Sequence, residues 1–176
     1  TNRVLHRYLN DEGWHLSEDE CMRIFVGKMV RSETEQIETN IGRAIDDEWM
    51  AVFYERRNIA LREELLAIPD SVLAVQAAHQ VFNGNIACAS GADMEKVLMQ
   101  LQKVALAPYF KHILSGHDCK RNKPFPDVYL KAASALKTDI SSCIVIEDSI
   151  TGVTSGASAG AEVWAYCPEN AHFSEE

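Results

Sequence analysis

Beyond residue 85, short apolar segments alternate with longer segments of helical periodicity. The apolar segments span residues 86–89, 113–114, 143–146 and 163–166. A strand buried on both faces reads as a short continuous apolar run, and strands that alternate with helices are typical of a parallel sheet. The sequence therefore predicts an α/β fold with a doubly wound parallel sheet. In such a sheet, ligands bind at the carboxyl ends of the strands.

The first third of the chain shows helical patterns only. Capping boxes are predicted at Ser17 and Ser32, because each is followed three residues later by Glu, and Asp46 is placed to cap a longer helix. The pattern changes after residue 67. We therefore expect a helical domain over residues 1–67 and an α/β domain over residues 68–176.

Composition narrows the classes of partner. With 17 Lys and Arg against 26 Asp and Glu, the formal net charge is −9, which disfavours binding to nucleic acid. No apolar run approaches the length of a membrane span. The five cysteines are widely spaced, without a C-x-x-C pair, as expected in a reducing compartment. We expect a cytoplasmic monomer whose partner is a small molecule.

Ser90, Gly91 and Ala92 directly follow the apolar run 86–89. A hydroxyl beside free backbone amides can hold a phosphate, and glycine allows the backbone to approach the ligand closely. The alternative is that Ser90 is an ordinary helix N-cap. This segment is a candidate phosphate-binding loop.

Lys123 precedes two prolines, Pro124 and Pro126, which make the segment stiff and extended. An ammonium group held in this way suits a phosphoryl oxygen or a carboxylate. The alternative is a solvated surface lysine in front of a helix.

Glu147 and Asp148 directly follow the apolar run 143–146. Two adjacent acids at the end of a buried strand are costly unless something offsets their charge. Mg²⁺ would do so and would keep coordination sites for water and phosphate oxygens. The alternative is that Asp148 caps the next helix. Together with Ser90 and Lys123, the two acids form a phosphoryl-transfer set that lacks a nucleophile.

These segments resemble three motifs of the haloacid dehalogenase-like superfamily, in the branch that contains β-phosphoglucomutase and 6-phosphogluconate phosphatase. Ser90 matches the second motif, Lys123–Tyr129 matches K-P-x-P-x-x-[FY], and Cys143–Ser149 with its small-residue helix matches the fourth. The resemblance covers essentially the whole chain. It implies a Rossmann-like core with an inserted α-helical cap, which residues 1–67 match in position and type.

The resemblance also implies an activity, namely Mg²⁺-dependent hydrolysis of a small sugar phosphate or sugar-acid phosphate through an aspartyl-phosphate. Ser90 and the amides of Gly91 and Ala92 would hold the phosphoryl oxygens, and Lys123 would stabilise the charge of the transferring group. Asp148 would bind Mg²⁺, with Glu147 as a direct or water-mediated ligand. A loop of the cap around Lys28 would contact the substrate, unless Lys28 is a solvated helix end.

One motif of the superfamily does not occur. D-x-D-G, which supplies the aspartate nucleophile, belongs just before the cap, and the sequence begins there. We expect a truncation, with the first strand and the carboxyl-terminal end missing, so that the fragment alone would be inactive. The alternatives are a sugar phosphomutase and a non-catalytic homologue of the same fold. A two-component receiver domain is disfavoured, because its acid pair comes early and its lysine last.

Overall fold

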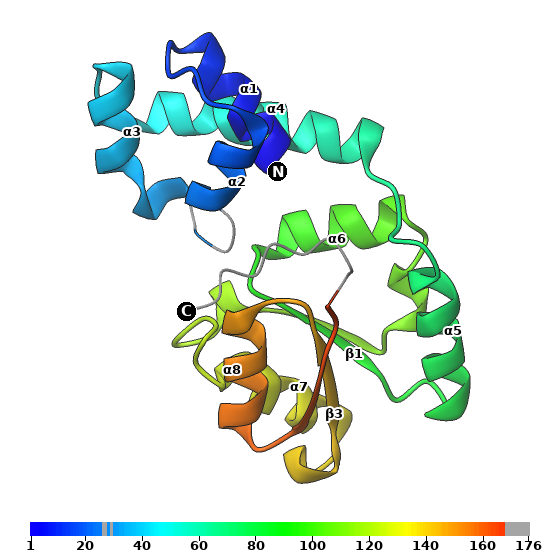
Figure 1. Cartoon of the computed structure of the whole chain (residues 1–176). Helices are drawn as coiled ribbons and strands as arrows, with labels where there is room; N and C mark the ends of the chain where they lie inside the picture. Colours follow the sequence, from blue (N-terminus) through cyan, green and yellow to red (C-terminus); the bar gives the residue numbers. More distant parts are fainter. Residues whose placement is uncertain (26–27, 29, 168–176) are drawn as a thin grey trace. The chain divides into compact units, whose positions relative to one another are not determined.

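The computed structural model describes the chain except for residues 26, 27, 29 and 168–176 (Figure 1). The chain divides into two compact units, Thr1–Leu66 and Ala67–Glu176, called here the helical unit and the α/β unit. Among the described residues, no helix is both long and apolar enough to span a bilayer.

The helical unit packs its helices around one aromatic and aliphatic core. Tyr8 stacks on Trp49 with ring centroids 4.6 Å apart, and Trp49 in turn stacks on Phe53. Leu5 and Ile37 are fully buried in the same cluster. The helices of this unit are α1 (Asn2–Asp11), α2 (Glu18–Phe25), α3 (Thr34–Ile41) and α4 (Asp47–Glu64).

Two of the three predicted helix starts are confirmed. Ser17 and Glu20 form a reciprocal capping box before α2, since each backbone amide donates to the other side chain. Asp46 caps α4 by accepting from the amide of Trp49. The box predicted at Ser32 is wrong. Helix α3 begins at Thr34, and its N-cap Glu33 makes no side-chain cap bond, because residues 30–32 form a 3₁₀ turn instead.

The α/β unit alternates strands and helices as the sequence predicts. Its strands are β1 (Ala87–Ser90), β2 (His112–Ser115), β3 (Ile144–Glu147) and β4 (Glu162–Ala165), and its helices are α5 (Ser71–Val81), α6 (Met94–Lys103), α7 (Asp127–Leu136) and α8 (Ile150–Ala159). Strand β1 pairs with β2 in parallel, and β3 pairs with β4 in parallel. The α/β class with parallel strands is therefore confirmed.

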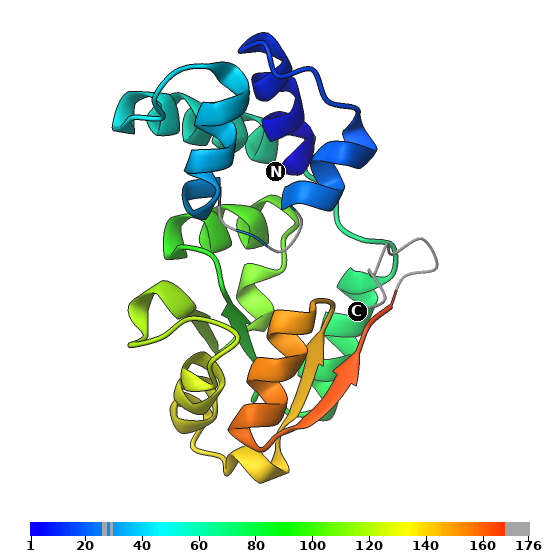
Figure 2. The same cartoon turned by 60° about the vertical axis from the view of Figure 1, so that its left-hand side comes forward.

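The described strands differ from the expected single sheet in one respect, because they form two separate pairs. Figure 2 shows β3 and β4 side by side, with α8 beside them. Helix α8 covers the face that carries Val145 and Val163, and a Cβ at Gly156 would lie 3.0–3.1 Å from these two side chains. Successive strand residues point to opposite faces, so Ile146 and Trp164 lie on the other face, 67% and 54% exposed.

Candidate functional site

Ser90 is the last residue of β1 and stands outside the helix that follows. Asp93 is the N-cap of α6, where it accepts from the amide of Lys96 at 2.9 Å. The Ser90 hydroxyl oxygen accepts from the amide of Ala92 at 3.1 Å, which leaves its O–H free to donate to a ligand. The structure thus excludes the reading of Ser90 as an ordinary N-cap. The Ala92 amide, predicted as a phosphate donor, is occupied by Ser90.

Lys123 reaches from the loop before α7 into the interior of the α/β unit. Its side chain is only 12% exposed, so it is not a solvated surface lysine. Its Nζ donates to the carbonyl oxygen of Ala89 in β1 at 3.1 Å, to the Tyr129 hydroxyl at 2.9 Å, and to the carboxylate of Glu147. One ammonium group therefore joins the carboxyl ends of β1 and β3.

The carboxylate of Glu147 is held from several sides. One oxygen accepts from both Lys123 and the Tyr129 hydroxyl, and the other accepts from the Ser149 hydroxyl at 3.2 Å. A Cβ at Gly152 would lie 1.9 Å from this second oxygen, so glycine is needed there for α8 to pack against the carboxylate. Burial raises the pKa of Glu147, but the hydrogen bonds from Lys123 and Tyr129 outweigh it and the net pKa is lowered.

Asp148 contrasts with its neighbour Glu147. It is exposed, and no side chain or amide of the described residues donates to its carboxylate. It is not the cap of α8 either, because Ser149 fills that position by accepting from the amide of Gly152 at 3.1 Å. Asp148 is therefore an uncommitted carboxylate at the end of β3.

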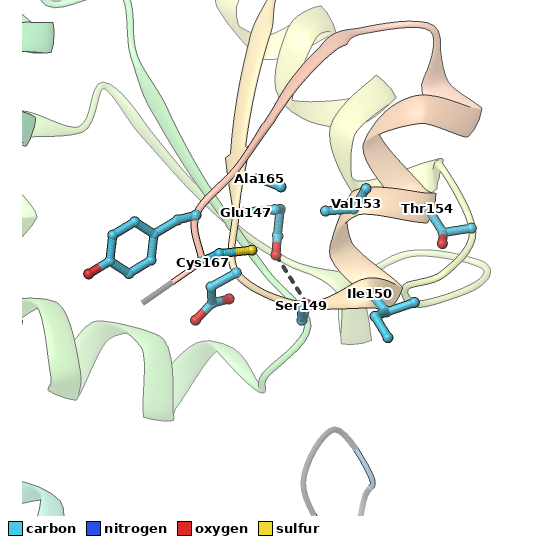
Figure 3. A pocket seen from close by; sticks show the side chains of 9 residues that line it. Glu147, Ser149, Ile150, Val153, Thr154, Ala165 and Cys167 are labelled. Atoms are coloured by element: carbon cyan, nitrogen blue, oxygen red, sulfur yellow. Dashed lines mark hydrogen bonds between the residues drawn. The ribbon is translucent and has the colours of Figure 1, made fainter. Parts of the chain in front are cut away.

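A shallow pocket of about 190 Å³ opens at this end of β3. Figure 3 shows Glu147 aimed at the Ser149 hydroxyl, with Ile150 and Val153 of α8 on one side of the pocket and Cys167 on the other. Asp148 is also part of the lining. The pocket thus combines charged groups at the strand end with an apolar wall.

The donors present suit Mg²⁺ better than a metal that needs a complete protein cage. Among the described residues, no group of three or more His, Cys, Asp and Glu side chains comes together. Mg²⁺ keeps several waters and is commonly held by one or two carboxylates together with phosphate oxygens. Asp148 offers such a carboxylate, whereas Glu147 is already paired with Lys123.

Lys28, the predicted substrate contact, belongs to the helical unit. Its Nζ pairs with the Glu33 carboxylate at 3.1 Å. Two other residues of the predicted loop, 26 and 27, lie outside the described residues. A role of Lys28 in the site stays a prediction.

Sequence reasoning missed two groups of this site. The Tyr129 hydroxyl contacts both Lys123 and Glu147, although the sequence only placed Tyr129 at the end of the third motif and gave it no role. The Asn122 amide bridges the backbone of Gly91 and Lys123, with donor–acceptor distances of 2.8 Å on each side. The polarity of Asn122, directly before Lys123, was the one available signal.

Three comparisons place the chain among known proteins. Residues 5–160 match the family model described as haloacid dehalogenase-like hydrolase. The chain is 31% identical to 6-phosphogluconate phosphatase of Escherichia coli over 113 residues, which is 61% of this chain and 51% of that protein. The chain spans about half the length of this curated relative.

Two solved structures share the fold. A haloacid dehalogenase family hydrolase from Deinococcus radiodurans, solved with bound phosphate and sodium, matches 93% of this chain and 72% of its own, with a TM-score of 0.74 and 26% identity. A β-phosphoglucomutase from Clostridium difficile matches 92% of this chain and 74% of its own, with a TM-score of 0.70 and 19% identity.

Proposed function

Because the chain belongs to the haloacid dehalogenase-like hydrolase family, we propose that the site at the ends of β1 and β3 is the phosphate site of a Mg²⁺-dependent phosphatase. The observation that carries the proposal is the buried ammonium of Lys123, which lies between Ala89 and Glu147. The ammonium bonds the carbonyl of the residue before Ser90, and a fixed positive charge near a hydroxyl that can donate is suited to binding a phosphoryl group.

The residues of this chain would act by binding and by charge stabilisation. The Ser90 hydroxyl and the amide of Gly91 would donate to phosphoryl oxygens. Lys123 would offset the negative charge that builds up during phosphoryl transfer. Glu147 would hold the ammonium in place, since its carboxylate accepts from Lys123 inside the unit.

Asp148 would hold Mg²⁺ next to the phosphate, and Glu147, whose carboxylate is already paired with Lys123, would act as a water-mediated ligand. The ion would supply positive charge for the phosphoryl oxygens and would orient the substrate. The nucleophile is proposed to be an aspartate outside these 176 residues. It would displace the sugar oxygen from phosphorus to form an aspartyl-phosphate, which water then hydrolyses.

We propose a small sugar phosphate or sugar-acid phosphate as substrate, in line with the similarity to 6-phosphogluconate phosphatase. The helical unit would act as the cap that selects it. A cytoplasmic location is supported by the cysteines, because all five are free.

A sugar phosphomutase is the second candidate. The mutases of this family favour Ser-x-x-Lys or Ser-x-x-Asn at the second motif, and the corresponding residue here is Asp93. Its carboxylate is engaged in capping α6, so it is not free to contact a sugar. This observation favours hydrolysis.

The test is phosphate release by the complete gene product that contains this chain. It would be supplied with Mg²⁺ and a panel of sugar phosphates and sugar-acid phosphates. We expect release of inorganic phosphate from at least one of them, and none after chelation of the metal. Isomerisation without release would show a mutase, and no turnover of either kind by a gene product that carries D-x-D-G would refute the proposal.

A further inference from the structure

Two backbone carbonyls of the loop after β1 accept hydrogen bonds from side chains at the end of β2 and in the segment that follows it. The Asn122 Nδ2 donates to the Gly91 carbonyl at 2.8 Å, and the fully buried Ser115 hydroxyl donates to the Ala92 carbonyl at 2.7 Å. Each bond fixes the orientation of one peptide plane. The loop that carries Ser90 is therefore held by donors outside itself.

The bond from Asn122 acts on Ser90 through a single peptide. In a trans peptide, the C=O and the N–H point in opposite directions. When the Gly91 carbonyl faces Asn122, the amide of Ala92 faces away from it, and this amide donates to the Ser90 hydroxyl oxygen at 3.1 Å. Asn122 thus fixes the hydroxyl that the proposed function assigns to phosphate.

The same side chain also fixes Lys123. The Asn122 Oδ1 accepts from the backbone amide of Lys123 at 2.8 Å. The two partners determine the orientation of the Asn122 amide, since a carbonyl needs a donor and an N–H needs an acceptor. One planar group therefore sets the spacing between the Ser90 loop and the start of the Lys123 side chain.

The space for this amide depends on Gly116. A Cβ at Gly116 would lie 2.0 Å from the Asn122 Oδ1 and 2.7 Å from its Cγ, which is too close for both groups to stay in place. Gly116 is buried, so the clash is not relieved at the surface. A methyl group at residue 116 would displace the Asn122 side chain and break both of its hydrogen bonds.

We propose that Asn122, in the space left by Gly116, is a positioning residue that holds Ser90 and Lys123 in the geometry needed for phosphate. The proposal rests on the proposed function, because it names how that same site is kept in order. Asn122 itself need not touch the substrate.

The test is a double-mutant cycle on Asn122→Ala and Gly116→Ala, read out by the affinity of the chain for inorganic phosphate with Mg²⁺. Each single variant should weaken binding about fivefold to tenfold, the size expected for a lost hydrogen bond. The double variant should be no weaker than Asn122→Ala alone, because the amide with which the methyl group clashes is then gone. Asn40→Ala is the matched control, since that amide bonds only a helix carbonyl in α3, and it should leave affinity unchanged.

A second measurement separates this proposal from the proposed function. In amide NMR spectra, both single variants should shift the same signals, those of Gly91, Ala92 and Lys123, in a chain that stays folded. Unshifted signals, or additive losses of affinity in the cycle, would overturn the positioning role. Absence of phosphate binding by the unmodified chain, with the amide shifts present, would refute the phosphate site and leave the role of Asn122 in the loop intact.

Discussion

The two units handle their ion pairs differently. In the five ion pairs found among the described residues of the helical unit, the basic side chain is 46–71% exposed. The α/β unit has an exposed pair as well, Arg121 with Asp127, in which the arginine is 50% exposed. It also has a buried pair, because the side chains of Lys123 and Glu147 are 12% and 9% exposed. Exposed pairs contribute little to stability because water screens them, whereas a buried pair carries a desolvation cost that only good geometry offsets.

This difference shows which charges are tied to a site. Arg57 is buried in the helical unit, but the ion-paired side chains of this unit lie outside its aromatic core, as is usual for solvated helix faces. The α/β unit instead places the Glu147 carboxylate in the lining of a pocket and pairs it with the Lys123 ammonium. Asp148 lines the same pocket and has no partner among the described residues. A buried carboxylate whose pKa is lowered, as that of Glu147 is, is typical of functional sites.

The largest effect is expected for Asp148→Asn in the complete gene product. Loss of the carboxylate should lower kcat with Mg²⁺ by about a hundredfold or more, because a bound metal contributes several kcal/mol to transition-state stabilisation. Asp93→Asn is the control, since asparagine caps a helix as well as aspartate does, and it should leave kcat unchanged. Equal losses in both variants would show that the metal site is misplaced.

The contrast between buried and exposed pairs can be tested by removing one cation from each unit. Lys123→Met keeps the length of the side chain but leaves Glu147 buried without its partner, which should lower the free energy of unfolding by about 3–5 kcal/mol. Arg3→Gln removes the ion pair with Glu18 at the surface. This variant should change the free energy of unfolding by about 0.5 kcal/mol or less. The measurement is urea unfolding of both variants. Similar losses would contradict the contrast.

The Tyr129 hydroxyl tests whether the buried pair depends on its neighbour. The Lys123 ammonium lies 4.8 Å from the centroid of the Tyr129 ring. Tyr129→Phe keeps this ring but removes a donor to a carboxylate, which should cost about 1.5–3 kcal/mol of unfolding free energy. Tyr109→Phe removes a neutral hydrogen bond to Gln76 and should cost about 1 kcal/mol. A smaller loss at Tyr129 than at Tyr109, again from urea unfolding, would mean that Glu147 is adequately held by Lys123 alone.

The features that depend on local sequence were predictable. The apolar runs predicted each of the described strands to within one residue at both ends. The polar residues after these runs indicated the site, because parallel strands bring their carboxyl ends to one edge of a sheet. The capping box at Ser17 was also predictable, because its two partners lie only three residues apart in the sequence. The box at Ser32 had the same pattern, but the preceding 3₁₀ turn shifted the start of α3.

Contacts between distant segments were not predictable from the pattern. The pairing of Lys123 with Glu147 joins two of the predicted positions, yet nothing in either motif indicates that one neutralises the other. The bond from Asn122 to Gly91 spans 31 positions and requires a glycine at residue 116 to leave room. Such contacts depend on how distant segments pack against each other, and no local sequence pattern predicts that packing.

The smallest effect concerns an exposed group of the helical unit, the capping box of α2. The side-chain hydrogen bond from Ser17, and then its backbone bond, lower the pKa of Glu20. A group whose pKa is lower in the folded state stabilises that state above its unfolded pKa, and the contribution is lost as pH falls through the folded pKa.

The Ser17 amide signal should therefore titrate in an NMR series with an apparent pKa below the usual glutamate value. Glu20→Gln should abolish this titration while keeping the cap, because glutamine also accepts from the Ser17 amide. A titration at the ordinary glutamate pKa would show that the hydrogen bonds of the box do not stabilise the charged form of Glu20. The box would then contribute as little to stability as the exposed ion pairs of the helical unit.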